Sequence, residues 1–164
     1  MIDSISPPTG SDAKKLFSGK FGADYLWSPT GDRLLVSTSY TKGGSQIGLG
    51  IANAGGGEFH TLDVPTFVSK ATWASDGETV YYALPLGIPS GAVFPNDYFG
   101  KPIHTTDMFW KMDVVTGKKD RIIDNSNMNG KDFDSIGLFL SPDMKFLFFT
   151  NRNDGHLYRI ELPQ

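Results

Sequence analysis

The chain has 164 residues with a net charge of −3, and it contains no cysteine. The absence of cysteine excludes disulfide bonds, thiolate metal ligands and a cysteine nucleophile, and the lack of any dense lysine–arginine block argues against nucleic acid as a partner. The 19 glycines, 10 prolines and 13% aromatic residues favour short strands joined by tight turns, and no stretch reaches the length of about 18 apolar residues that spans a bilayer.

The N-terminal segment, residues 1–17, has a turn signal at Pro7-Pro8-Thr9-Gly10 between two short segments. A similar arrangement recurs around Val115-Thr116-Gly117, where two strands are expected. Repetition within one chain is the sequence signature of solenoids and propellers. We therefore interpret residues 1–17 as the tail of a preceding repeat unit.

The first complete unit covers residues 21–62 and is built around the motif Trp27-Ser28-Pro29-Thr30-Gly31. The motif predicts a hairpin in which a strand ends in a large apolar side chain and a tight turn follows. Pro29 presets φ for this turn, and Gly31 supplies a positive φ. Three more strands are expected before residue 62.

The second unit, residues 67–123, repeats the motif as Trp73-Ala74-Ser75-Asp76-Gly77 and is expected to have four strands. Asp76 can accept hydrogen bonds from the backbone of its own turn. We therefore interpret it as a turn cap and not as a catalytic carboxylate. Trp27 and Trp73 both end a first strand, and we interpret them as packing residues.

The third unit, residues 134–162, repeats the motif as Leu140-Ser141-Pro142-Asp143-Met144. Asp143 is the counterpart of the turn-capping aspartate in the second unit. Met144 takes the place of the turn glycine, where a side chain at positive φ is strained. The sequence ends after the third strand of this unit, which is therefore expected to lack its outer strand.

The strands that leave the three turns are continuously apolar: Leu34–Val36, Val80–Tyr82 and Phe146–Phe149. A strand with one wet face would alternate apolar and polar residues, so both faces of each strand are expected to be covered. Radially stacked four-stranded sheets provide that environment. We therefore predict an all-β fold, a β-propeller of three four-stranded antiparallel blades.

The motifs resemble those of TolB-like propeller repeats, a WD-repeat-like family. In that family a Ser-Pro-Asp-Gly hairpin is followed by a Ser-Asn-Arg-Asp-Gly turn and an Ile-Tyr strand; the similar residues here are Ser141-Pro142-Asp143 and Asn151–Tyr158. Propellers have four to eight blades. Three units therefore imply either part of a longer propeller or half of a six-bladed ring that a second copy completes.

An insertion at residues 84–107 is the one region that the repeats do not explain. It contains four prolines and several aromatic residues, and a long loop in a compact fold is often functional. We interpret it as a candidate partner-binding segment; the alternative is that its aromatic residues only pack onto their own blade. The candidate residues are Phe94, Asn96, Asp97, Tyr98, Phe99 and His104.

Motifs of catalysis are missing from the sequence. The three histidines lack metal-ligand spacing, no Gly-Lys pair has the rest of a phosphate loop, and no nucleophile elbow occurs. Arg152 is expected to tie its turn to a neighbouring strand or blade. We predict no catalytic residues, no cofactor and no metal.

The function predicted from the sequence is a non-catalytic protein-interaction or scaffold module, bound by a protein partner or by further propeller blades. A homodimer that completes a six-bladed ring is one form of this prediction. The alternative is an accessory propeller domain of a peptidase or hydrolase whose catalytic domain lies outside this chain. The resemblance to TolB-like proteins implies an extracytoplasmic location.

Overall fold

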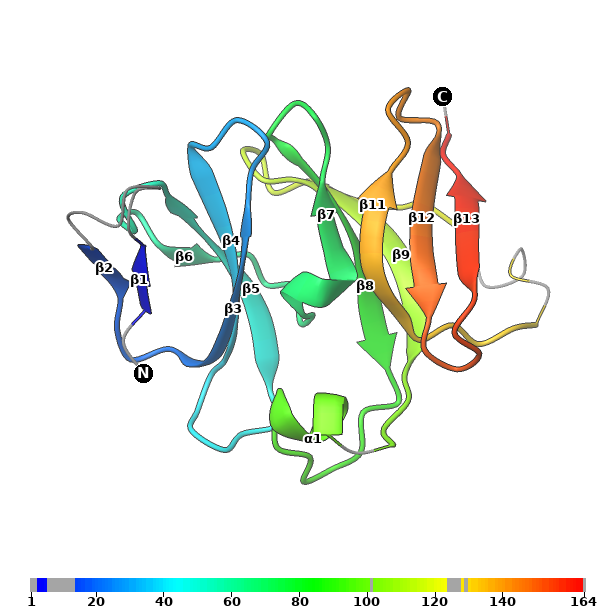
Figure 1. The fold of residues 1–164 in the computed structure, drawn as a ribbon, viewed down its shortest axis with the longest axis horizontal. Coiled ribbons are helices and arrows are strands. Elements are labelled where there is room, and N and C mark those ends of the chain that lie inside the picture. Colours follow the sequence, from blue (N-terminus) through cyan, green and yellow to red (C-terminus); the bar gives the residue numbers. More distant parts are fainter. Residues whose placement is uncertain (1–2, 6–13, 101, 124–127, 129, 164) are drawn as a thin grey trace.

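A computed structural model describes residues 3–5, 14–100, 102–123, 128 and 130–163 (Figure 1). Within these residues the fold consists of short antiparallel strands, one short α-helix and one 3-10 turn. The strands are β1 (Asp3–Ile5), β2 (Lys14–Phe17), β3 (Phe21–Trp27), β4 (Arg33–Ser39), β5 (Ile47–Asn53), β6 (His60–Thr61), β7 (Ala71–Trp73), β8 (Thr79–Leu86), β9 (Thr106–Asp113), β10 (Lys119–Arg121), β11 (Ser135–Leu140), β12 (Phe146–Asn151) and β13 (Leu157–Glu161).

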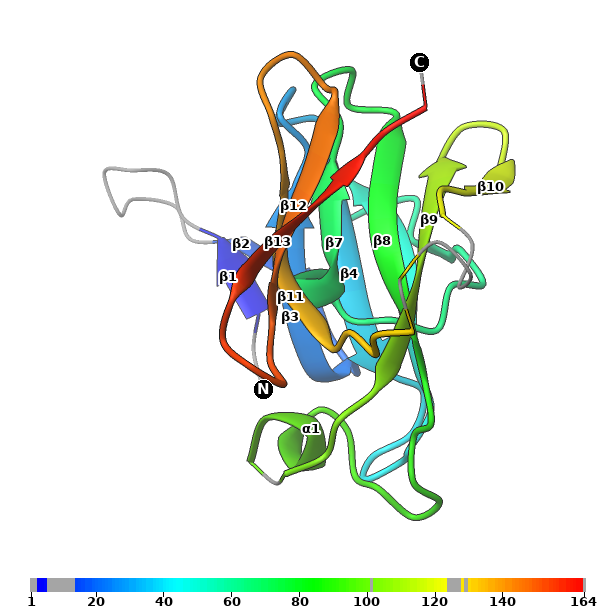
Figure 2. The same ribbon diagram turned by 90° about the vertical axis from the view of Figure 1, so that its right-hand side faces the viewer.

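The strands form three blade-like sheets and one N-terminal hairpin. Blade 1 has the order β3-β4-β5-β6, blade 2 has β7-β8-β9-β10, and blade 3 has β11-β12-β13; β1 pairs with β2. Figure 1 shows the three sheets side by side, with blade 2 in the middle and the hairpin beyond blade 1. Figure 2 views the molecule from the blade 3 side, with β12 and β13 in front. The all-β propeller fold predicted from the sequence is confirmed, with sheets of four, four and three strands in the described part of the chain.

The three predicted hairpin turns form as the motifs indicate. Gly31 and Gly77 have φ values of 73° and 69°. Met144 has a φ of 59°, so the position that replaces glycine does adopt the left-handed conformation. In blade 2, Asp76 Oδ1 accepts hydrogen bonds from the backbone N–H groups of Glu78 and Thr79, each at 2.8 Å, which is the expected turn-capping role.

Two apolar cores lie between the blades. The core between blades 1 and 2 includes Leu35 and Leu49 from one side and Trp73 and Val80 from the other. The core between blades 2 and 3 includes Phe109 and Phe149. Each sheet therefore supplies side chains to the neighbouring sheet, as in stacked propeller blades.

A third apolar cluster covers the far side of blade 1. Phe17, which ends β2, is 6% exposed and stacks on Tyr25 with the ring centroids 5.8 Å apart. It packs with Leu34 and Val36 of β4. The N-terminal hairpin thus lies where the outer strands of a preceding blade would lie.

The strands extend into the predicted insertion from both ends. β8 continues to Leu86 and β9 begins at Thr106, and these two residues are paired. The irregular part is therefore shorter than the predicted 84–107. Pro85 is tolerated inside β8 because β7 pairs only as far as Tyr82, so the missing N–H faces no neighbouring strand.

Two expectations about covered side chains are wrong. Trp73 is 6% exposed, but Trp27 is 39% exposed because the apolar cluster beneath the hairpin reaches Tyr25 of β3 and does not include Trp27 at the end of that strand. β12 also differs from β4, in which every residue after Arg33 is buried. In β12 burial alternates, with Leu147 and Phe149 buried and Phe146 and Phe148 half-buried, because no sheet in the described chain covers its second face.

Candidate interaction site

The insertion folds over one end of blades 1 and 2 and contains the short helix α1 (Asn96–Gly100) (Figure 1). Phe94 and Tyr98 are 3% and 0% exposed and pack against Phe67, which precedes the 3-10 turn η1 (Val68–Lys70). The rings of Phe67 and Tyr98 stack with centroids 4.6 Å apart. Two of the candidate partner-binding aromatic residues therefore fill the core of the insertion itself.

The other candidate residues in the insertion lie nearer the surface. Phe99 is 55% exposed, and the His104 side chain is half exposed. Asn96 is exposed, and half-buried Asp97 caps the helix by accepting a hydrogen bond from Val93 N at 3.0 Å. The structure therefore divides the six residues into a buried pair and a surface group, and partner binding by the surface group stays a prediction.

A fully buried ion network ties the insertion to blades 2 and 3. Lys70 has no exposed surface, and its Nζ donates to Asp107 Oδ2 at 2.6 Å, to Asp134 Oδ1 at 2.8 Å and to the Ser135 carbonyl at 2.8 Å. Thr105 Oγ1 donates to both aspartates. All three donor positions of the ammonium group are therefore used.

Asp134 is the second centre of this network. The Tyr98 hydroxyl donates to its Oδ1, and Arg152 Nη1 donates to its Oδ2 at 2.8 Å. Burial by itself would raise the pKa of Asp134. The charge and hydrogen bond of Lys70, the hydrogen bond of Tyr98 and the charge of Arg152 together outweigh burial and hold the pKa below its ordinary value. Burial, with the hydrogen bond to Asp134, raises the pKa of Tyr98.

Arg152 ties its turn to the insertion, where the expected partner was a neighbouring strand or blade. Besides Asp134, its guanidinium donates to the Tyr98 carbonyl at 2.9 Å and to the Ile103 carbonyl at 3.1 Å, and it stacks on the Tyr98 ring at 4.1 Å. It thereby joins blade 3 to the insertion. Two cations and two aspartates partner one another in the network, so its charges are satisfied inside the protein.

Blade 3 differs from blades 1 and 2 at the outer edge of its third strand. In blades 1 and 2 the third strands β5 and β9 are each paired on their outer side, with β6 and β10. β13 is the corresponding third strand of blade 3, and within the described residues it pairs only with β12. Its outer edge therefore presents unpaired backbone groups, which can pair with another strand.

The outward face of blade 3 carries an aromatic cluster. Phe139 is 47% exposed and stacks on Phe148 with the ring centroids 5.0 Å apart. Arg159 lies over the ring of Phe146 at 4.6 Å, and Leu157 on β13 is 60% exposed. We call this face, with the free edge of β13, the open side of blade 3.

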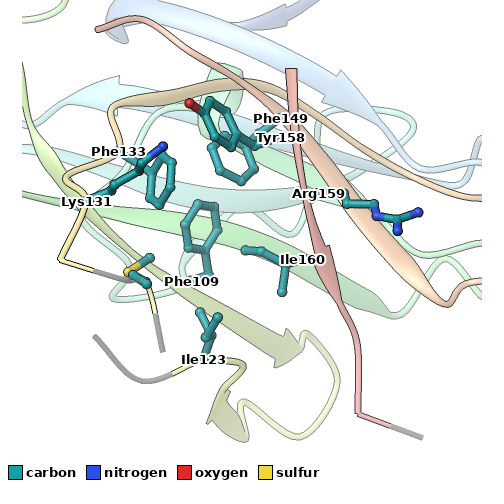
Figure 3. Close-up of a pocket in the computed structure, with 9 residues that line it drawn as sticks. Phe109, Ile123, Lys131, Phe133, Phe149, Tyr158, Arg159 and Ile160 are labelled. Carbon is teal, nitrogen blue, oxygen red and sulfur yellow. The ribbon is translucent and has the colours of Figure 1, made fainter. Parts of the chain in front are cut away.

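A cavity of about 230 Å³ lies beside β13, between blades 2 and 3. Figure 3 shows Phe109, Ile123 and Ile160 pointing into a common apolar space, while the guanidinium of Arg159 turns away from it. Lys131 lies at one end, with Nζ 5.6 Å from the ring of Tyr158. In blade 2 the fourth strand β10 pairs with β9, and its Lys119 donates to the Asp63 carbonyl at 2.8 Å.

The remaining repeat positions have structural surroundings. Arg33 donates to the Gly77 carbonyl at 3.0 Å, so the turns of blades 1 and 2 are linked directly. Asp143 accepts a hydrogen bond from Ser141 Oγ at 2.6 Å. Leu140 packs into the core between blades 2 and 3. Pro29, Gly31 and Pro142 lie exposed in their turns.

Sequence reasoning missed Lys70, Asp107 and Asp134 as a buried group. These residues lie far apart in the chain, and each alone reads as a surface charge. One signal was available: Thr105 and Asp107 end the insertion where a third strand begins, and Asp134 and Ser135 begin the next blade. The open side of blade 3 was foreseen as a missing strand, but its residues were not identified.

No protein-family model matches the chain, and no curated protein matches its sequence. Within the described residues, no helix is long and apolar enough to cross a membrane. Several solved structures do share the fold. TolB from Acinetobacter baumannii superposes with a TM-score of 0.64 at 15% identity, and the match covers 96% of this chain and 34% of TolB.

Two enzymes also share the fold. Oligogalacturonate lyase from Vibrio parahaemolyticus gives a TM-score of 0.61 at 16% identity, covering 96% of this chain and 41% of the lyase. The tricorn protease gives 0.55 at 9% identity, covering 90% of this chain and 13% of the protease. This chain thus spans less than half of each of these proteins. Its fold is that of part of a TolB-like β-propeller.

Proposed function

We propose that this chain is a non-catalytic protein-interaction module and that the open side of blade 3 is its binding surface. The proposal concerns binding alone, because the folds that resemble this chain include both TolB and enzymes. The binding surface comprises the free edge of β13 and the outward side chains Phe139, Phe146, Phe148 and Leu157.

The observation that supports this proposal is the mismatch between sequence and burial in β12. Four consecutive apolar residues, Phe146–Phe149, are typical of a strand covered on both faces. The described residues cover one face and leave Phe146 and Phe148 half-buried on the other. Exposed apolar surface next to a free strand edge is characteristic of a protein-binding surface.

The buried ion network supports a structural role for the charged residues. Lys70 and Arg152 direct their hydrogen bonds to aspartates and carbonyls of the chain itself. Among the described residues, no group of three or more histidines, aspartates or glutamates is placed to hold a metal ion. The network is best understood as the anchor that holds the insertion against blade 3.

Site-specific photocrosslinking in the source cells tests the proposal. A photoreactive phenylalanine analogue replaces Leu157 on the open side or, as the control, Val115 on a turn of blade 2. The two side chains are similarly exposed, at 60% and 63%. We expect a discrete protein adduct from position 157 and none from position 115.

Equal adducts from both positions, or none from either, would contradict the proposal. Mass spectrometry of the adduct identifies the bound protein. A peptidase or hydrolase subunit in the adduct would support the accessory-domain alternative, in which the same surface holds a catalytic domain.

A further inference from the structure

The interface between blades 1 and 2 defines which side chains a covered blade face uses. From blade 2 it takes Trp73, at the end of the first strand, and its paired residue Val80. From blade 1 it takes Leu35, on the second strand, and Leu49, on the third. Each blade therefore has two different faces. The face toward the preceding blade uses the end of the first strand and its paired residue, as blade 2 does here. The face toward the following blade uses residues of the second and third strands, as blade 1 does here.

The N-terminal side of blade 1 has the first kind of face. Trp27 ends the first strand and pairs with Leu34, just as Trp73 pairs with Val80. Trp27 is 39% exposed, although its counterpart Trp73 is 6% exposed. The inner part of this face is therefore available for a further blade.

The open side of blade 3 has the second kind of face. Leu140 pairs with Leu147, so Phe148, one residue later, corresponds to Leu35 in blade 1. Leu157 is likewise the counterpart of Leu49, which has no exposed surface. The two halves of the interface that blades 1 and 2 form are thus both present at opposite ends of the described chain. The half on blade 1 is uncovered at Trp27, and the half on blade 3 is uncovered at Phe139 and Leu157.

We infer that a second copy of this chain covers the open side of blade 3, with its blade 1 packed against that face. The inference rests on the proposed function and names its partner. A two-fold axis lets each copy present blade 3 to blade 1 of the other copy, so both ends of both chains are covered. Two sets of three blades give a six-bladed ring, within the range of four to eight found in propellers.

The N-terminal hairpin offers a strand that can pair with the free edge of β13 in a second copy. Leu16 on β2 is partly buried against blade 1, in the way that Leu62 after β6 and Ile122 after β10 pack between blades. This makes β2 a fourth strand by position, and β1 lies beside it as a third strand. In the ring, β13 of the second copy takes the place of β1 and pairs with β2.

Static light scattering of the purified full chain at micromolar concentration tests the inference. We expect a mass near twice 17.9 kDa. Leu157→Glu and Trp27→Glu each place a charge in both interfaces of the ring, so each variant alone is expected to weaken association by at least about tenfold. Val115→Glu, on an exposed turn, is the matched control and keeps the doubled mass.

A mixture of the two variants gives the sharpest result. A mixed pair joins blade 3 of the Trp27→Glu chain to blade 1 of the Leu157→Glu chain. This interface is intact because neither substitution lies in it. The mixture is therefore expected to recover part of the doubled mass that neither variant shows alone. Circular dichroism verifies that each variant is folded, and Phe139→Glu and Trp27→Ala serve as substitutes for any variant that is not.

Three outcomes overturn the inference. A monomeric wild-type chain excludes the ring. If Leu157→Glu dissociates the dimer and Trp27→Glu does not, the two copies contact each other through their blade 3 faces instead. A dimer that the mixture fails to restore does not use reciprocal faces. If the chain is monomeric but still crosslinks to another protein at position 157, the partner is not a second copy of this chain, and the result still supports the proposed function.

Discussion

The covered face of blade 1 and the open side of blade 3 are equivalent in position and opposite in environment. Leu35 and Leu49 have no exposed surface, whereas their counterparts Phe148 and Leu157 are half-buried and 60% exposed. All four are large apolar residues. The residue type is thus the same on both faces, and the presence of a neighbouring sheet makes the difference.

This comparison shows that the sequence is suited to a neighbour that the described chain does not provide. Burial of a leucine or phenylalanine side chain stabilises a protein by about 1.5–3 kcal/mol. On the open side the described residues do not provide this stabilisation. It becomes available when another sheet packs there, which couples folding stability to association.

The greatest loss of stability is expected at the buried ion network, which anchors the insertion to blades 2 and 3. Lys70→Met removes the cation from two buried aspartates and is expected to lower the free energy of unfolding by about 3–5 kcal/mol. Urea unfolding measures the change. Lys145→Met, at an exposed pair with Asp143 in the turn of blade 3, is the control and should change it by less than about 0.5 kcal/mol. Similar small effects in both variants would mean that the buried network is not an anchor.

Substitution of the two equivalent leucines tests directly whether a neighbouring sheet makes the difference between the two faces. Leu49→Ala is expected to cost about 2–5 kcal/mol because it leaves a cavity between blades 1 and 2. Leu157→Ala should cost less than about 0.5 kcal/mol in dilute protein. Thermal unfolding over a range of protein concentrations measures both, and the cost of Leu157→Ala should grow with concentration if another chain covers it. A cost independent of concentration would argue against coverage by association.

The pH dependence of stability tests Asp134. Because its pKa is lowered in the folded protein, its contribution to stability is complete above the ordinary value of 3.8 and is lost as the pH falls through the folded pKa. The slope from one such group is at most about 1.4 kcal/mol per pH unit. Asp134→Asn removes this titration, so the stability gap between wild type and variant should narrow from pH 7 to pH 3 in urea unfolding.

Asp143→Asn serves as the comparison for Asp134→Asn, since Asp143 lies exposed in a turn and its hydrogen bond with Ser141 lowers its pKa without burial. A gap for Asp134→Asn that stays constant with pH would show that the carboxylate is not held ionised by Lys70.

The smallest effect concerns the turns of blades 1 and 3. Met144→Gly relieves a side chain at a φ of 59° and should raise the free energy of unfolding by about 0.5–1 kcal/mol. Gly31→Ala, at the equivalent φ of 73° and with open space around the new Cβ, should lower it by about 1 kcal/mol. Denaturation midpoints measure both. Changes of the same sign would mean that the two turns are not equivalent.

The repeat motif made much of the fold predictable from the sequence. Trp27, Trp73 and Leu140 mark strand ends because a local turn signal follows each of them, and such signals depend on a few adjacent residues. The candidate site was less predictable. Phe94 and Tyr98 have the composition of a binding loop, but Phe67, from a distant segment, determines that they are buried.

The hairpins, the repeat and the positive φ at Met144 follow from the order of residues, because each depends on local backbone preferences. The covering of apolar faces and the meeting of Lys70, Asp107 and Asp134 arise only when distant segments pack together. Burial and buried charge pairing depend on which segments become neighbours in space. No local pattern in the chain specifies those neighbours.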